Sequence, residues 1–182
     1  MNKSRLTKFI LILMAALLVC TSCRTVKTPS SAKSEPAASL SEYDGPYEVS
    51  YVFDGDTFAI KVEEKEIRIR VLGIDTPESV ASEESGKENT EEGTIASDRA
   101  KELLEGSKVY LEYDKDLYDK YGRTLAYVYL EDGNMFEEMM ISEGLAKVVW
   151  YEPNTKYTEY FKKLEKQAKT DKVGFWGTGY YN

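Results

Sequence analysis

The chain has 182 residues, of which 42% are hydrophobic and 31% charged, a length and balance that suit one compact domain with extensions. It carries 24 basic and 32 acidic side chains, a formal net charge of −8, and no histidine. The lack of imidazole excludes a Ser-His-Asp triad, a histidine general base and a histidine-ligated zinc or iron site. The remaining carboxylates, lysines, arginines and tyrosines favour hard cations such as Ca²⁺ or Mg²⁺ and chemistry on phosphate groups.

The first residues have the pattern of a bacterial export signal. Three basic residues precede an apolar run from Phe9 to Val19, which is shorter than the roughly 20 residues needed to cross a bilayer. The run ends in Cys20-Thr21-Ser22-Cys23, which resembles a lipobox with Cys23 as the lipidated residue, although position 20 usually holds leucine. We therefore expect residues 1–22 to be a lipoprotein-type signal peptide and the protein to face outside the cytoplasm on the cell envelope. Ordinary secretion is the alternative.

Residues 23–45 are expected to be the lipidated cysteine and a flexible tether to the membrane. Five serines, two prolines and several alanines leave too little bulky apolar material in this segment to form a core. We expect the folded domain to occupy residues 46–182 and the protein to be a monomer.

Alternation of apolar and polar residues predicts five short strands in this domain. They cover residues 49–53, 58–62, 67–71, 109–113 and 124–130. The first two flank Asp54-Gly55-Asp56 and look like a hairpin. The third sends its aliphatic side chains to one face and both Arg68 and Arg70 to the other. The fifth ends at the turn pair Asp132-Gly133.

Helical spacing of apolar residues appears in three segments, residues 95–104, 135–140 and 157–168. Asn134 with Glu137 resembles a capping arrangement for the second, and Asn154 or Thr155 could cap the third. Five strands with inserted and appended helices predict an α+β fold that is mainly β. The expected architecture is a five-stranded, partly open barrel of the oligonucleotide-binding (OB-fold) type with about three α-helices.

Three polar clusters follow predicted strand ends, and they are Asp54-Gly55-Asp56-Thr57, Arg70 through Glu78, and Asp119-Lys120-Tyr121-Gly122-Arg123. Each cluster alone could be an ordinary turn or a solvated loop. Their combination is more informative. Asp56 and Asp75, with a backbone carbonyl and waters, could hold a divalent cation in a domain without nitrogen or sulfur ligands.

Four segments, in this order and spacing, resemble the thermonucleases, the staphylococcal nuclease-like family. They are residues 53–57, 70–78, 119–123 and 144–148, and the resemblance runs from about Tyr47 to Trp176. It implies the OB-fold barrel and an enzyme that hydrolyses DNA and RNA on the 5′ side of the phosphate. The products would carry 3′-phosphates.

The resemblance also implies roles for individual residues. The ligands of a catalytic Ca²⁺ would be Asp56, Asp75 and the backbone carbonyl of Thr76. The groups acting on the scissile phosphate and on the attacking water would be Arg70, Arg123 and Glu78. A divalent cation and two guanidinium groups can stabilise the negative charge that gathers on a phosphodiester in the transition state, and none of this requires histidine.

The implied substrate contacts are Lys120 and Tyr121, near a terminal phosphate and the nucleotide, and the aromatic pair Trp150 and Tyr151. The family usually has two tyrosines separated by one residue where this chain reads Trp150-Tyr151 and is one residue shorter. An aromatic ring can stack on any base for about 1–3 kcal/mol, so the replacement is compatible with base stacking. Packing of the indole in the core is the alternative.

The segment 79–93 departs most from the family pattern. It has five glutamates and one lysine, whereas the best-known family members are lysine-rich here. Such a loop should repel nucleic acid, although a charge run is most often only a solvated loop.

Two further functions fit the same fold. One is a catalytically silent module that binds nucleic acid or a partner on the cell envelope, and the other is an envelope lipoprotein with a structural role. The five acidic and arginine positions of the proposed mechanism are all retained, which favours the enzyme.

Overall fold

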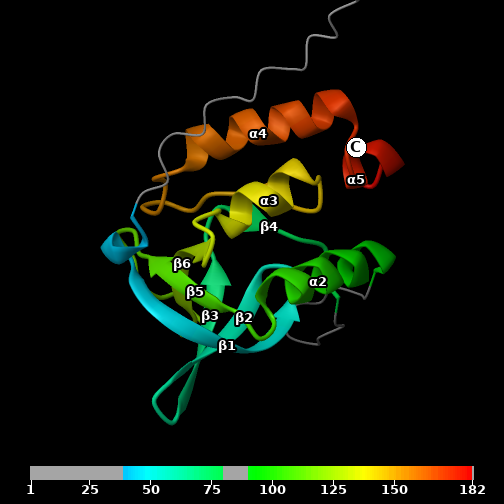
Figure 1. The fold of residues 1–182 in the computed structure, drawn as a ribbon. Coiled ribbons are helices and arrows are strands. Elements are labelled where there is room, and N and C mark those ends of the chain that lie inside the picture. Colours follow the sequence, from blue (N-terminus) through cyan, green and yellow to red (C-terminus); the bar gives the residue numbers. More distant parts are fainter. Residues whose placement is uncertain (1–38, 80–89, 182) are drawn as a thin grey trace, which may run out of the picture. The chain divides into compact units, whose positions relative to one another are not determined.

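A closed five-stranded barrel forms the centre of the fold in the computed structural model, which describes residues 39–79 and 90–181 (Figure 1). Its strands are β1 (Asp44–Asp54), β2 (Thr57–Val62), β3 (Lys65–Val71), β5 (Lys108–Glu112) and β6 (Thr124–Leu130). Their order is β1-β2-β3-β6-β5, and β5 closes on β1. The β3–β6 pair is parallel and the other barrel pairs are antiparallel. The predicted α+β fold on a five-stranded OB-type barrel is confirmed, but the barrel is closed and not partly open, because β5 pairs with β1.

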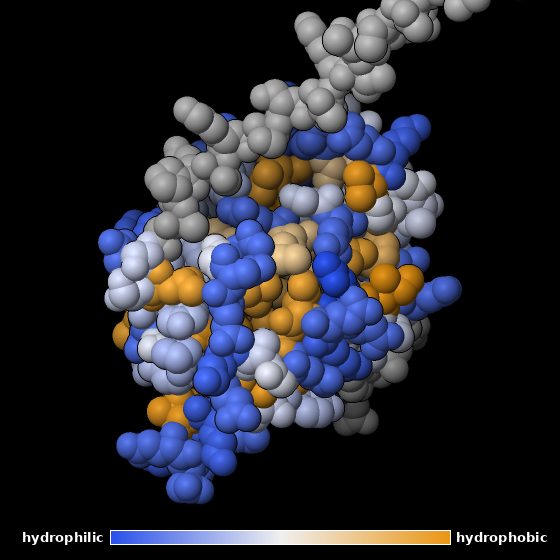
Figure 2. All heavy atoms as spheres, in the orientation of Figure 1, coloured by the Kyte–Doolittle hydropathy of each residue, from blue (hydrophilic) through white to orange (hydrophobic). Residues whose placement is uncertain are grey.

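The strand alternation places apolar side chains inside the barrel as predicted. Phe58, Ile69, Val109 and Val128 are completely buried, and burial of one such side chain stabilises the fold by about 1.5–3 kcal/mol. The tip of the β2–β3 hairpin, residues 63–66, is entirely charged, and Figure 2 shows hydrophilic residues at this lower-left projection. The hairpin tip is therefore an outer turn of the barrel that contributes nothing to the core.

Three main helices confirm the helical predictions. They are α2 (Glu91–Leu104), α3 (Phe136–Ser142) and α4 (Thr158–Asp171). In Figure 1, α2 packs against β1, whereas α3 packs against both β6 and α4. Elements outside the sequence prediction are the turn η1 (Leu40–Glu42), the short helix α5 (Phe175–Thr178) and a two-stranded sheet of β4 (Ile74–Asp75) and β7 (Lys147–Val148).

The fold begins before the expected boundary at Pro46. Leu40 and Tyr43 pack against the core, and the ring of Tyr43 stacks on Tyr129 with centroids 4.0 Å apart. These apolar side chains find partners on the barrel although their segment is rich in serine. The leader, Cys23 and the tether up to residue 38 lie outside the described residues. In residues 39–79 and 90–181, no helix has the length and apolar character needed to cross a membrane.

The predicted caps at Asn154 and Thr155 are both wrong. Tyr157 precedes α4 without a side-chain cap, and Asn154 is buried against a distant loop. Its amide group donates to the carbonyl of Asp116 and accepts from the backbone N–H of Asp116, both at 2.8 Å. The side chain is used to hold a loop in place, since its two hydrogen bonds satisfy a buried polar backbone unit.

The predicted cap at Asn134 and Glu137 is also wrong. Asn134 donates to the side chain of Asp132, and Met135 precedes α3 without a side-chain cap. Glu137 is completely buried, and its carboxylate accepts the backbone N–H of Val128 at 3.0 Å. Burial raises the pKa of Glu137 well above its usual value, because the hydrogen bonds from the backbone offset the loss of water only in part.

Glu137→Gln is expected to stabilise the protein at neutral pH. In the folded state Glu137 keeps a proton that the unfolded chain releases near its ordinary pKa of about 4.3, so stability is highest below that pH and falls as pH rises toward the folded pKa. The slope for one proton is at most about 1.4 kcal/mol per pH unit. Thermal unfolding between pH 4 and pH 8 should show the variant gaining on the wild type as pH rises, whereas Glu138→Gln should not. If the melting temperatures of Glu137→Gln and the wild type change with pH in parallel, this prediction is wrong.

Candidate active site

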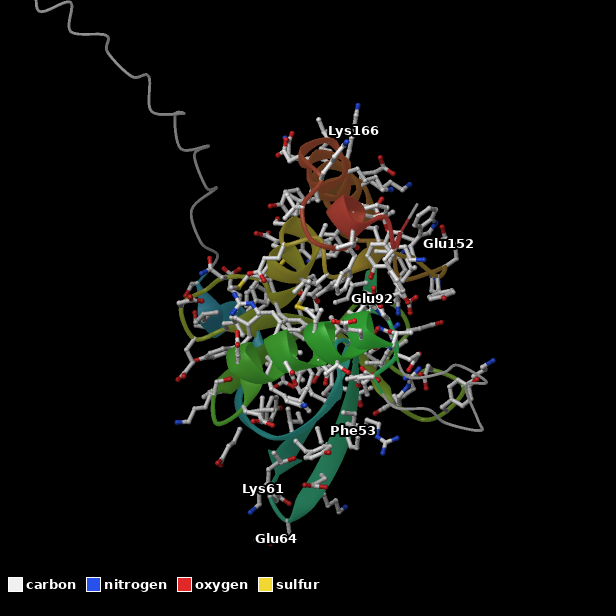
Figure 3. All side chains as sticks on the ribbon, turned by 90° about the vertical axis from the view of Figure 1, so that its right-hand side faces the viewer. Phe53, Lys61, Glu64, Glu92, Glu152 and Lys166 are labelled. Atoms are coloured by element: carbon white, nitrogen blue, oxygen red, sulfur yellow. The ribbon has the colours of Figure 1, made fainter. Side chains whose placement is uncertain are left out.

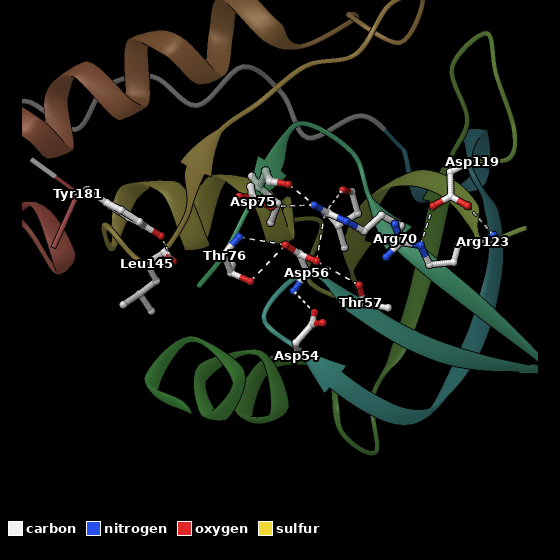
Figure 4. A network of polar contacts seen from close by, with 12 residues as sticks. Asp54, Asp56, Thr57, Arg70, Asp75, Thr76, Asp119, Arg123, Leu145 and Tyr181 are labelled. Carbon is white, nitrogen blue, oxygen red and sulfur yellow. Dashed lines mark hydrogen bonds and ion pairs between the residues drawn. The ribbon is translucent and has the colours of Figure 1, made fainter. Parts of the chain in front are cut away.

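Asp56 lies in the turn between β1 and β2 and is 6% exposed. Its Oδ2 accepts the backbone N–H of Thr76 at 2.9 Å and the hydroxyl of the same residue at 3.2 Å, and its Oδ1 accepts the hydroxyl of Thr57 at 3.1 Å (Figure 4). A Cβ on Gly55 would lie 2.7 Å from the Thr76 hydroxyl oxygen. Glycine is therefore needed at position 55 for the turn to approach the segment after β4.

Arg70 joins the two carboxylates that the sequence assigned to a cation. Its Nη1 lies 3.2 Å from Oδ1 of Asp56, and its Nη2 donates to Oδ1 of Asp75 at 3.2 Å. Nη1 also donates to the backbone carbonyls of Val71 and Ile74, both at 2.9 Å. The guanidinium is thus fixed by main-chain acceptors, while its position on β3 follows from the predicted alternation of that strand.

The oxygen donors around Arg70 fit a hard divalent cation. One carboxylate oxygen of Asp56 and one of Asp75 each lie 3.2 Å from a nitrogen of the Arg70 guanidinium group. Thr76 follows Asp75 directly in the chain. In the part of the chain that the structure describes, no group of three or more His, Cys, Asp or Glu residues is arranged to hold a metal. A cation here would consequently need backbone oxygens and water beside the two carboxylates, a composition that Ca²⁺ accepts.

Asp54 is a site residue to which the sequence analysis assigned no role. Its Oδ1 accepts the backbone N–H of Asp56 at 3.0 Å, which shapes the turn. Burial, followed by the charge of Asp56, raises the pKa of Asp54 to about 7, and the charge of Glu78 adds a smaller increase. The signal in the sequence was the repeated aspartate of Asp54-Gly55-Asp56. Because the charge of Glu78 affects the pKa of Asp54, the carboxylate of Glu78 shares the electrostatic environment of Asp54 and Asp56.

The N-terminus of α2 positions Glu78. Thr90 caps this helix by accepting the backbone N–H of Gly93 at 2.9 Å, and its own backbone N–H donates to the carbonyl of Glu78 at 3.2 Å. A Cβ on Gly93 would lie 1.9 Å from that carbonyl oxygen. The helix therefore contacts the backbone of Glu78 closely because position 93 has no side chain.

Gly93→Ala is expected to reduce kcat by about 10- to 100-fold, since displacement of a reacting group by about 1 Å can cost a factor of that size. The added methyl must push the Glu78 carbonyl away, and the Glu78 side chain moves with it. Steady-state kinetics on single-stranded DNA would measure the change, together with a melting curve to confirm folding. Thr94→Ala, an exposed change in the same helix, should keep kcat. Equal kcat for both variants would show that Glu78 is not positioned through Gly93.

Arg123 is held by Asp119 within one tight loop. Its Nε donates to Oδ2 of Asp119 at 2.6 Å, and Oδ1 accepts the backbone N–H groups of Tyr121 and Arg123, both at 2.9 Å. Burial disfavours ionisation of Asp119, but these hydrogen bonds outweigh it and lower the pKa of Asp119. In Figure 4, Arg70 lies between the Asp56–Asp75 pair and the Arg123–Asp119 pair, consistent with Arg70 pairing Leu125 across β3 and β6.

The predicted substrate residues are exposed. Tyr121 is 69% exposed, and the ammonium group of Lys120 lies 4.9 Å from the centre of its ring. Trp150 is 47% exposed and Tyr151 74% exposed, so the indole is not part of the core. The ammonium group of Lys162 lies 4.0 Å above Trp150.

The acidic segment 79–93 is described only at residue 79 and at residues 90–93, so most of this prediction lies outside the described residues. Glu91 and Glu92 are described and form the first turn of α2. Acidic residues in the first turn of a helix interact favourably with its dipole, so these two have a local structural role as well as a charge.

The model of the family described as staphylococcal nuclease homologue matches residues 68–178. The curated thermonuclease of Staphylococcus hyicus is 39% identical over 175 residues, which cover 94% of this chain and 98% of the relative. The thermonuclease of Staphylococcus intermedius is 41% identical over 133 residues, or 71% of this chain and 75% of the relative. This chain belongs to the staphylococcal nuclease family.

A Bacillus subtilis protein, endonuclease YncB, is 44% identical over 130 residues, which cover 70% of this chain and 60% of the relative. The staphylococcal nuclease family and these relatives identify the enzyme class of the chain as a nuclease, as the sequence predicted. Arg70, Glu78 and Arg123 lie inside the matched residues 68–178, and Asp56 precedes them.

Proposed function

We propose that the protein is a Ca²⁺-dependent nuclease that hydrolyses DNA and RNA and leaves 3′-phosphorylated products. The main support is the arrangement of Asp56 and Asp75 around Arg70, in which hard oxygen donors and a guanidinium fixed by backbone carbonyls meet at one point. Oxygen donors and a preorganised cationic fork are the groups that phosphodiester hydrolysis requires.

In the proposed mechanism, Arg70 and Arg123 each present a guanidinium fork to the oxygens of the scissile phosphate. Both forks are oriented before substrate arrives, Arg70 by two carbonyls and Arg123 by Asp119. Glu78 orients the attacking water and accepts its proton as the water oxygen bonds to phosphorus. The P–O5′ bond breaks, and the leaving 5′ oxygen takes a proton from solvent. Asp56, Asp75 and the carbonyl of Thr76 would hold the cation, which supplies charge neutralisation at the phosphate when bound. Stabilisation of the transition state more than of the bound substrate raises kcat.

The direct test is a nuclease assay of the purified protein on heat-denatured DNA and on RNA. We expect cleavage in Ca²⁺ and its loss when a chelator is added, with product ends that a 3′-phosphatase modifies. Cleavage that persists in excess chelator would contradict the metal requirement, and products with free 3′-hydroxyls would contradict the bond assignment. Binding without cleavage would favour the silent binding module.

We also propose that Cys23 carries a lipid that anchors the enzyme to the outer side of the membrane. Residues 1–22 would be removed, and the tether would carry the nuclease domain, which supplies all of the described catalytic groups. Secretion without a lipid is the alternative.

Cys23→Ala is expected to shift the protein from the membrane fraction to the soluble fraction without changing its specific activity, because Cys23 precedes every strand of the barrel in the sequence. Fractionation of cells followed by immunodetection and a nuclease assay would measure both quantities. Cys20→Leu, which brings the segment closer to the usual lipobox, should retain the protein in the membrane. Retention of Cys23→Ala in the membrane would contradict the lipid anchor.

A further inference from the structure

A pocket of about 620 Å³ lies beside the small β4–β7 sheet and has no role in the mechanism above. Its polar and aromatic lining residues are Lys147, Glu165, Lys169, Trp176 and Tyr181. Lys147 pairs with Asp75 across the β4–β7 sheet, so the pocket adjoins a candidate ligand of the cation. Figure 4 shows Tyr181 on the same side of the network as Asp75 and Thr76.

The two lysines of the pocket are held over aromatic rings. The ammonium group of Lys147 lies 5.2 Å from the ring centre of Tyr181, and that of Lys169 lies 4.4 Å from the ring centre of Trp176. Contacts of this kind attract a cation to the face of the ring. They keep both ammonium groups at the pocket wall, each near one face of an aromatic ring.

The polar groups of the pocket are mainly hydrogen-bond donors. Glu165 is the one lining carboxylate, and it already accepts the backbone N–H of Val148 at 3.0 Å and the ammonium group of Lys169 at 2.7 Å. Lys147 forms no ion pair with a carboxylate of the described residues. A site with two ammonium groups and one carboxylate suits an anion.

We propose that this pocket binds a backbone phosphate of the nucleic-acid strand beyond the phosphate that is cleaved, an inference that rests on the proposed nuclease function. The pocket gives a protein with a net charge of −8 a local cationic contact next to its active site. Because one ammonium group lies over the ring of Trp176 and another over that of Tyr181, the pocket fits a phosphate better than a base.

The test compares Lys147→Gln with Lys166→Gln in the full chain. Lys166 lies on the exposed side of α4, away from the pocket lining, and is labelled in Figure 3, so its substitution changes the net charge equally. Both variants and the wild type are assayed on a dinucleotide and on an eight-residue single strand.

For Lys147→Gln we expect KM for the eight-residue strand to rise about three- to fivefold, the size of one partly exposed ionic contact. The KM for the dinucleotide and both kcat values should remain unchanged. The slope of log KM against log salt concentration should also become shallower by about 0.7, as expected for one lost phosphate contact on a single strand. Lys166→Gln should match the wild type in every one of these quantities.

Equal KM and salt slope for the two variants, with an active wild type, would overturn the phosphate pocket and leave the proposed function intact. An equal rise of KM for dinucleotide and eight-residue strand would overturn it too, because Lys147 would then act at the scissile phosphate. If inorganic phosphate stabilises the wild type against thermal unfolding more than Lys147→Gln, while KM for the eight-residue strand is the same in both proteins, the pocket binds free phosphate and the strand contact is overturned. A wild type that cleaves neither substrate would overturn the proposed function and this inference together.

Discussion

Arg123→Ala is expected to lower kcat by about 10²- to 10³-fold, the usual cost of removing one donor that stabilises charge in a transition state. The variant should still fold, because Asp119 keeps its hydrogen bond from the backbone of Tyr121 and the loop remains tied through Asn154 to the chain before α4. Arg123→Lys should be poor as well, since an ammonium group cannot reproduce the bidentate fork of a guanidinium.

The control for this experiment is Lys115→Ala, which removes one positive charge from an exposed position in the same connection between β5 and β6. Its kcat should stay within a few-fold of the wild type. If Arg123→Ala folds normally and cuts DNA as well as Lys115→Ala does, Arg123 is not part of the mechanism.

Glu78→Gln is expected to lower kcat by about 10²- to 10⁴-fold, the range that general acid–base catalysis contributes. The amide has nearly the same shape as the carboxylate but cannot accept a proton from water. The backbone of Glu78 should stay in place, because the bond from Thr90 goes to its carbonyl and not to its side chain. The KM for DNA should change little.

Rapid single-turnover kinetics would separate the chemical step from product release in this variant. Glu91→Gln makes the same change of charge at an exposed position in the first turn of α2 and should retain wild-type turnover. A similar loss of activity in both variants would attribute the effect to the local field and not to water activation.

Local patterns in the sequence predicted the barrel strands and the three main helices well. Alternation on residues 67–71 placed Arg70 on the opposite face from Ile69, and this choice of face is what directs the guanidinium into the site. Such patterns report burial along one segment. They contain no information on partners far away in the sequence, which is why the hydrogen bonds of Asn154 with Asp116 and the burial of Glu137 were missed.

The residue types of the candidate site could be predicted from the sequence, and their contacts with one another could not. The order of the motifs identified Asp56, Arg70 and Asp75, but nothing local indicates that one guanidinium contacts both carboxylates. The contact between Gly93 and Glu78 was also missed, since glycine in the first turn of a helix has many possible reasons. Both features depend on how separate elements pack, which single-segment periodicity does not describe.

The parallel pairing of β3 and β6 has a kinetic consequence for the enzyme. The turn with Asp56 and the strand with Arg70 belong to neighbouring hairpin strands, whereas Arg123 reaches them only when Thr124 and Leu125 pair with Ile69 and Arg70. Closure of such long loops is slower than formation of hairpins. A nascent or refolding chain that has only its local hairpins therefore has one of the two guanidinium groups of the proposed mechanism in place, and under that mechanism catalytic competence arises with the completed barrel.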